Sequence, residues 1–276
     1  MTRLQRVLPA LALLAAAPMA SAQPLSTGTA ELTSFRLQVV DLTPDDGIAP
    51  ALSISPGGHV FTALQIDARW LTDPSPLFID QRLQFDTYPS PSPLGDAAAT
   101  LSVAGVTGSA QRTATGLFAS GTGGDGLATQ TLSWWETFKT NSQMPDGLPV
   151  WTGSFELGAG TAVTLTADYR VSARIAAGYG GAVIATSGLH GFVGTVYAGN
   201  LQRDLGTASL GAPGEESVSG ALTLTLANPS AQVVPVYFGA HTYVYTEAPS
   251  PVPEPASLLM LLSGGVLVAW RVRRHR

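Results

Sequence analysis

Apolar and polar side chains alternate with a period of two along many short runs between residues 30 and 246. The clearest run has these apolar members at alternate positions: Val163, Leu165, Ala167, Tyr169 and Val171. A second clear run has these: Val234, Val236, Phe238, Ala240 and Val244. Successive side chains of a β-strand point to opposite faces, so this pattern predicts strands with one buried and one solvated face. No interior segment shows a helical stripe over three turns.

Turn-forming sequences separate these runs. They combine Pro, Gly, Asp and Asn at Pro44–Gly47, Pro56–Gly58, Pro145–Gly147, Gly158–Gly160 and Asn228–Ser230. Many short strands at near-regular spacing predict an all-β fold with roughly ten or more strands. We therefore expect a single antiparallel β-sandwich-like domain over residues 23–247, with a barrel as the alternative.

The composition excludes several kinds of chemistry. The chain of 276 residues contains no cysteine, which rules out disulfides, thiolate metal sites and a cysteine nucleophile. Residues 23–253 carry 8 basic and 18 acidic side chains, a formal charge of −10. Nucleic acids and anionic membranes require clustered Lys and Arg, so neither is an expected partner of this acidic body.

Two glycine- or aspartate-rich strings resemble binding loops only in part. The string Gly121–Gly126 matches a dinucleotide-binding fingerprint, but residues 127–138 after it read as a strand where that motif needs a helix. The string Asp41–Gly47 has Asp at the sixth position of a calcium loop, where an EF-hand needs Gly. We expect a turn at each string, and a calcium site of another kind at Asp41–Gly47 remains the alternative.

No catalytic constellation is visible in the sequence. The histidines His59, His190 and His241 stand singly, without a spacing that places two metal ligands on one face, and no Gly-x-Ser-x-Gly elbow occurs. We therefore predict no catalytic residues, no metal and no cofactor, and we expect that the protein is not an enzyme.

Two adjacent tryptophans provide a candidate ligand-binding feature. Trp134 shares its parity with Leu132 and Phe138, which predicts a core position for Trp134 and an outward position for Trp135. An exposed Trp135 is a candidate glycan platform on which a sugar ring can stack; its alternative is burial under a loop. A tyrosine-rich set shares one face of the last strand, which fits either cross-strand packing or ligand binding: Tyr237, His241, Tyr243 and Tyr245.

The N-terminal residues 1–22 are typical of a secretory signal peptide. Arg3 and Arg6 precede the apolar run of residues 7–17, which is too short to span a bilayer. The small residues of Ala20–Ala22 predict signal cleavage between Ala22 and Gln23.

The C-terminal residues fall into three blocks. Residues 248–255 form a Pro-rich linker that ends in Pro253, Glu254 and Pro255. Residues 256–270 are predicted to form a short transmembrane helix, which is marginal as a permanent anchor and favours transient insertion followed by cleavage. Residues 271–276 form a basic tail, predicted to be cytoplasmic, with these cations: Arg271, Arg273, Arg274 and Arg276.

This arrangement resembles the PEP-CTERM sorting signal of exported proteins of Gram-negative bacteria. The resemblance rests on Val252–Ser257, on the leucine-rich residues 258–262 and on the basic tail. It implies that Pro253, Glu254 and Pro255 are recognised by an exosortase, a membrane-embedded cysteine-type peptidase that removes the hydrophobic tail. It also implies an association with exopolysaccharide and biofilm.

Together these features predict a protein that is exported across the inner membrane and reaches the cell surface or the extracellular matrix after processing. Its expected partners are the export machinery, the exosortase and the inner membrane, each transiently, and extracellular polysaccharide. The expected role is structural or adhesive. A carbohydrate-binding module is the first alternative, and a secreted enzyme with an unrecognised site is the second.

Overall fold

The computed structural model describes residues 25–55, 58–71, 80–89, 95–124, 126–141, 150–194 and 201–248. The predicted signal peptide, transmembrane helix, basic tail and sorting motif lie outside these ranges. Across the described ranges, no helix is long and apolar enough to cross a membrane. The described residues form fifteen strands: β1 (Ser26–Asp41), β2 (Leu52–Ile54), β3 (His59–Trp70), β4 (Asp80–Pro89), β5 (Ala97–Val103), β6 (Val106–Thr113), β7 (Gly116–Gly123), β8 (Leu127–Asn141), β9 (Val150–Thr152), β10 (Phe155–Leu157), β11 (Thr161–Ile175), β12 (Ala182–Val193), β13 (Gln202–Leu210), β14 (Gly214–Asn228) and β15 (Val234–Ala248).

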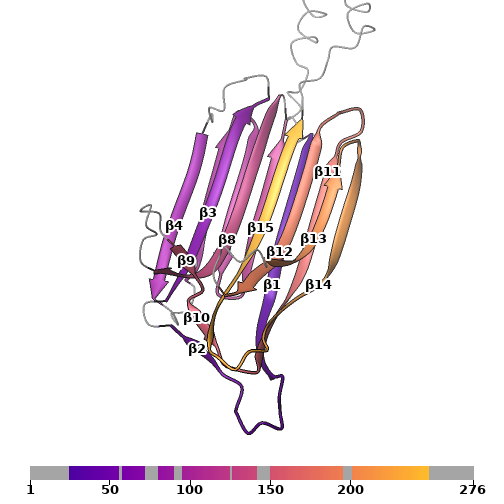
Figure 1. Ribbon diagram of the computed structural model, residues 1–276. Coiled ribbons are helices and arrows are strands. Elements are labelled where there is room, and N and C mark those ends of the chain that lie inside the picture. The colour runs from indigo at the N-terminus through magenta and orange to yellow at the C-terminus, as the bar shows by residue number, and fades with distance from the viewer. Residues whose placement is uncertain are drawn as a thin grey trace, which may run out of the picture.

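The strands form two antiparallel sheets, which confirms the predicted all-β, sandwich-like fold. The smaller sheet has six strands in the order β14-β11-β1-β7-β6-β5. The larger sheet has the order β13-β12-β15-β8-β3-β4, and the short strands β10, β2 and β9 extend it to nine strands. Figure 1 shows the six long strands of this larger sheet side by side, from β4 on the left to β13 on the right. One of the two sheets is curled like half of a barrel.

The first and last strands both occupy interior positions. Strand β1 lies between β11 and β7 in the smaller sheet, and β15 lies between β12 and β8 in the larger one. A bulge between Thr33 and Arg36 interrupts the pairing of β1 with β11, and Ser34 adopts a positive φ of 57° there. The sheets are therefore completed only when the two ends of the body are in place.

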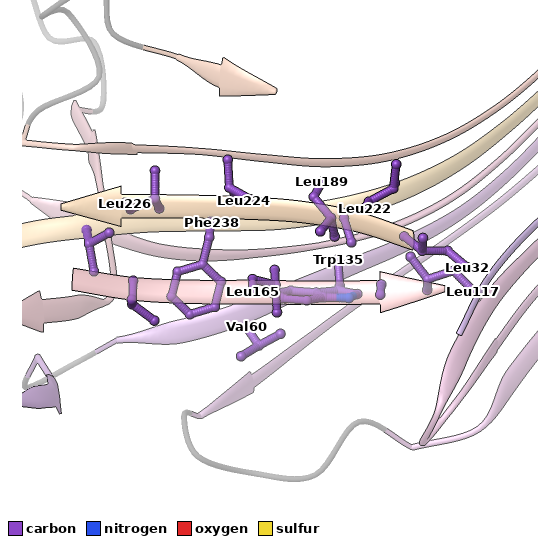
Figure 2. Packing of buried hydrophobic residues seen from close by; sticks show 14 of the residues in the cluster. Leu32, Val60, Leu117, Trp135, Leu165, Leu189, Leu222, Leu224, Leu226 and Phe238 are labelled. Atoms are coloured by element: carbon purple, nitrogen blue, oxygen red, sulfur yellow. The ribbon is translucent and has the colours of Figure 1, made fainter. Parts of the chain in front are cut away.

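The main hydrophobic core lies between the sheets and confirms most of the predicted strand faces. Alternate apolar residues of β11, β14 and β15 meet in one cluster (Figure 2), which includes Val163, Leu165, Leu222, Leu224, Leu226, Val236 and Phe238. A second cluster around Val171, Ala173 and Val244 continues the core toward the opposite end of these strands. The two-residue alternation of the sequence thus corresponds to side chains that point into the sandwich.

Elsewhere glycines in the smaller sheet allow side chains of the larger sheet to approach its backbone closely. Glycines of the smaller sheet face the larger one: a Cβ added at Gly28 would lie 2.7 Å from Val244 Cγ1, and one at Gly121 would lie 2.8 Å from Thr129 Oγ1. A Cβ at Gly108 would overlap Ile66. Strand β8 accordingly directs short hydroxyl side chains inward here: Thr129, Thr131 and Ser133. The buried hydroxyl of Thr129 remains satisfied by Thr246 Oγ1 at 2.7 Å and by the carbonyl of Thr122 at 3.0 Å.

A fully buried arginine, Arg112, pairs with a carboxylate of β4. The Arg112 side chain is 1% exposed, and its Nη2 lies 3.3 Å from Asp86 Oδ2. Its Nε donates to the carbonyl of Gly95 at 2.8 Å, and its Nη1 donates to Thr62 Oγ1. The buried charge is thus paired and hydrogen-bonded, as a guanidinium in a protein interior must be.

Candidate functional site

Trp135 is a core residue, so the prediction that it faces solvent is wrong. Its side chain is 8% exposed, and its ring packs edge-on against that of Phe35, at 5.8 Å between ring centroids. It also packs edge-on against Phe238, at 6.0 Å (Figure 2). Trp134 points to the outer face of the larger sheet instead, where it is half-buried. The parity of β8 is reversed because its hydroxyl residues, and not Leu132 and Trp134, fill the narrow space between the sheets.

Four large side chains form an oblique line across the outer face of the larger sheet. In the strand register, Trp134 of β8 pairs with Ala63 of β3 and with His241 of β15. On β3, Phe61 is offset from Trp134 by two residues along the strands, because Phe61 pairs with Glu136. On β15, Tyr243 is offset by two residues in the opposite direction, because it pairs with Leu132. On β12, Ile184 continues the line, because it pairs with Tyr245, two residues beyond Tyr243. We call these four residues the diagonal stripe: Phe61, Trp134, Tyr243 and Ile184.

The members of the diagonal stripe lie within reach of one another. Diagonal neighbours on adjacent strands are about 7–8 Å apart, a distance that aromatic side chains bridge. The rings of Phe61 and Trp134 lie 6.1 Å apart at an interplanar angle of 51°. Ile184 is 36% exposed. The stripe therefore presents a partly solvated apolar track that crosses four strands.

A polar cluster flanks the diagonal stripe on the side of β12. His190 Nε2 lies 3.2 Å from the hydroxyl of Tyr237 and 3.4 Å from Glu136 Oε1. The ring of His241 is 5.5 Å from that of His190, and Phe192 stacks on Tyr237 at 4.8 Å. Gly239 makes this packing possible, because a Cβ there would lie 2.8 Å from His190 Nε2. We call Glu136, His190, Tyr237 and His241 the polar cluster.

The polar cluster perturbs the pKa values of its members. Burial opposes ionisation of Glu136, but hydrogen bonds with His190 and Tyr237 outweigh it and lower the pKa of this carboxyl. Burial and the nearby Glu136 charge raise the pKa of Tyr237. Burial, His190 and Arg203 lower the pKa of His241 to about 4. At neutral pH the cluster therefore presents an ionised Glu136, a neutral Tyr237 hydroxyl and a neutral His241 ring.

Polar side chains also flank the diagonal stripe on the side of β3 and β4. Asp67 accepts hydrogen bonds from Gln65 Nε2 at 2.6 Å and from Gln81 Nε2 at 2.8 Å. Farther along, the Arg69 guanidinium lies 5.7 Å from the centre of the Tyr245 ring, and the Tyr245 hydroxyl donates to Glu247. Carboxylate, amide and hydroxyl groups thus border the stripe on both sides.

The other sequence candidates form turns and strands. Asp41 Oδ1 accepts from the amide of Thr43 at 2.9 Å, and Asp46 Oδ1 accepts from that of Ile48 at 2.7 Å, which confirms a capped turn. The glycine string 121–126 ends β7 and begins the turn into β8, where the amide of Leu127 donates to the carbonyl of Gly124. Within the part of the chain that the structure describes, no group of three or more His, Asp or Glu side chains is placed to hold a metal ion.

Comparison with known proteins identifies the C-terminus. A family model described as the PEP-CTERM protein-sorting motif matches residues 251–274. The chain carries a PEP-CTERM sorting motif. The motif indicates an exported, cell-envelope-associated protein and implies processing by an exosortase. Because the PEP-CTERM match covers only residues 251–274, which follow β15 in the sequence, it assigns a route to the protein and no ligand to the body.

The comparisons say little about the body itself. No curated protein matches the chain. One solved structure is described as a carbohydrate-binding module of the β-sandwich superfamily with promiscuous specificity. The match has 10% sequence identity, covers 79% of this chain and 96% of that chain, and has a TM-score of 0.11. Because this TM-score is so low, the similarity implies neither a shared topology nor a shared ligand.

Proposed function

We propose that this exported protein is a structural or adhesive component of an extracellular polysaccharide matrix or biofilm, and that it binds polysaccharide through the diagonal stripe. The observation that carries the proposal is the apolar track of Phe61, Trp134 and Tyr243 with hydrogen-bonding groups on both sides. Sugar rings combine apolar faces with hydroxyl edges, so they are complementary to aromatic rings bordered by carboxylate and amide groups.

The charge distribution favours a neutral polysaccharide. Glu136 contacts His190, and the Tyr245 hydroxyl donates to Glu247 and accepts from Arg69, so these charged groups already have partners on this face. Residues 23–253 carry a formal charge of −10, which repels polyanions such as uronate polymers. Uncharged, hydroxyl-rich chains bind without opposing this charge.

We further propose that the face binds glycan without cleaving it. The lowered pKa of Glu136 keeps this carboxyl ionised at neutral pH, which suits a hydrogen-bond acceptor and not a general acid. In this proposal the polar cluster orients the Tyr237 hydroxyl and the His241 ring toward sugar hydroxyls. The same groups would have to exchange protons with substrate in an enzyme, so an assay for cleavage separates the two roles.

The test compares binding to insoluble cellulose and chitin with binding to alginate, a polyanion. We expect retention on a neutral polymer and a loss of roughly tenfold in affinity, about 1.4 kcal/mol, for Trp134→Ala. Phe118→Ala is the matched control, because Phe118 is a half-buried aromatic on the outer face of the smaller sheet. Absence of binding to both neutral polymers, or equal loss in the two variants, would reject the stripe as the site.

Two further readouts address the finer parts of the proposal. Tighter binding to alginate than to the neutral polymers would contradict the neutral class. An increase in reducing ends during incubation would show that the face cleaves its ligand. The matrix role predicts that the protein stays with washed matrix material and that Trp134→Ala shifts it into the wash.

A further inference from the structure

We infer that strand β5 is a self-association edge, through which two copies of the protein join their smaller sheets into one continuous antiparallel sheet. The inference concerns a different part of the molecule from the diagonal stripe and does not depend on glycan binding. Strand β5 pairs with β6 along one edge and is the outermost strand of the smaller sheet. Its second edge carries backbone donors and acceptors that no described strand occupies.

The other outer strands carry features that oppose pairing with a second chain: β2 and β9 are only three residues long, and β13, β14 and β4 carry charged groups. At one side of the sandwich, β13 and β14 are bridged: Asp204 Oδ2 accepts from the amide of Thr223 at 2.6 Å, and Glu216 Oε2 accepts from the amide of Ser209 at 2.9 Å. At the other side, β4 begins with an exposed ion pair in which Arg82 Nη2 lies 3.5 Å from Asp80 Oδ2. Charged side chains on an edge discourage the approach of another strand.

Strand β5 has none of these protective features. Its sequence, Ala-Ala-Ala-Thr-Leu-Ser-Val, contains no charge and no proline. The acidic residue that precedes it, Asp96, is engaged elsewhere, because its Oδ1 accepts from the amide of Ala114 at 3.1 Å. A natural sheet that leaves such an edge uncharged is predisposed to strand addition.

A second copy is the occupant that fits this edge by symmetry. Antiparallel pairing about a twofold axis at Thr100 places Ala99 opposite Leu101 of the other copy, and Ala98 opposite Ser102. The inward residues Ala97, Ala99 and Val103 are only partly buried against the cluster of Leu101 and Val106, so a second strand would cover their exposed portion. The outward side chains of β5 are small, so they would not clash with those of the second copy.

Two-fold pairing of this kind would also make the protein bivalent. Each copy would contribute its own larger sheet, so one dimer could contact two polysaccharide chains or two points on one chain. Linked sites raise the effective affinity for a surface without any new contact to the ligand.

The experiment measures the oligomeric state of the exported protein by sedimentation velocity over a wide concentration range. We expect a concentration-dependent dimer. Thr100→Lys should weaken dimerisation at least tenfold, because two like charges would lie opposite each other at the axis. Thr223→Lys is the matched control: it makes the same substitution at an exposed position on β14, the opposite edge of the same sheet.

The outcomes separate cleanly. Dimers in the unaltered protein and in Thr223→Lys, with monomers in Thr100→Lys, support the inference. A monomer at every concentration, or equal dimerisation of both variants, overturns it. At concentrations too low for dimerisation, thermal unfolding of Thr100→Lys should match that of the unaltered protein, because its side chain is exposed. In addition, amide exchange within Ala97–Val103 should slow as the concentration rises and should not change in Thr100→Lys.

Discussion

Trp134 and Trp135 are neighbours in the chain and lie on opposite faces of the larger sheet. Trp135 packs between Phe35 and Phe238 in the core, whereas Trp134 meets Phe61 on the outer face. The same residue type therefore contributes to stability at one position and to the proposed ligand-binding surface at the next. Substitutions at the two positions should consequently affect different measurements.

Trp135→Ala should destabilise the fold by about 3–5 kcal/mol, because it removes a large buried ring from the main core. Trp135→Phe should cost less: it retains a ring and removes an indole N–H that has no hydrogen-bond partner among the described residues. Chemical denaturation of both variants measures these differences. Trp134→Ala serves as the comparison, and a larger loss of stability for Trp134→Ala than for Trp135→Ala would contradict the assignment of faces.

Gly108→Ala tests the close approach of the two sheets. The added methyl group would overlap Ile66 and lie 3.1 Å from Thr131 Oγ1, so we expect overpacking that costs about 1–3 kcal/mol. Gly211→Ala is the control, since no heavy atom lies within 4 Å of the position of its added methyl. Thermal unfolding checks the pair. Equal melting temperatures for the two variants would mean that the sheets are not in contact at Gly108.

Asp86→Ala should destabilise the protein more than Arg112→Met does. Removal of Asp86 leaves a fully buried cation without its carboxylate, a change that typically costs about 3–5 kcal/mol. Arg112→Met leaves behind a carboxylate that is 32% exposed and can be hydrated, and methionine fills much of the space. Denaturant unfolding of the two variants gives the order. The reverse order would show that the hydrogen bonds of Arg112 to Thr62 and Gly95 matter more than its charge.

Stability should fall as the pH decreases from about 6.5 to about 4. The folded-state pKa of His241 is about 4, below the value of roughly 6.5 expected in the unfolded chain. The unfolded state therefore binds more protons across this window, and acidification favours it. The full shift corresponds to at most about 3 kcal/mol, and partial solvent exposure of the ring reduces that figure.

The measurement is the free energy of unfolding at several pH values, with His241→Gln as the comparison. This variant should flatten the curve between pH 6.5 and 4. Glu136 acts in a separate window, since its lowered pKa adds stability that is lost only below the usual carboxyl range. A wild-type slope that persists in His241→Gln would assign the titration to another group.

The fold was predictable where large apolar residues alternate with polar ones. In β11, β14 and β15 the apolar set faces the core, as the two-residue period indicates. In β8 the same logic fails, because the facing glycines Gly28, Gly108 and Gly121 belong to other strands and narrow the space. Which parity fits a narrow interior depends on the partner sheet, and this is not visible within β8 itself.

For the candidate site too, the sequence predicted what a single strand specifies and missed what depends on pairing between strands. The shared face of Tyr237, His241, Tyr243 and Tyr245 was predictable from one strand. The diagonal stripe depends on the register between β3, β8, β15 and β12, which no local sequence pattern specifies. Arg112 could have been found, because it shares its parity with Val106, Gly108 and Ala110, all of which face inward.

The interior positions of β1 and β15 bear on the order of events during export. A chain that emerges with its N-terminus first presents β1 early, but β1 must wait for β7 and β11 before both of its edges are paired. The larger sheet lacks a central strand until residues 234–248 have emerged, only a few residues before the sorting motif at 251–274. The body can thus finish folding only as the sorting motif reaches the membrane, which couples the completion of folding in time to the arrival of the processing site.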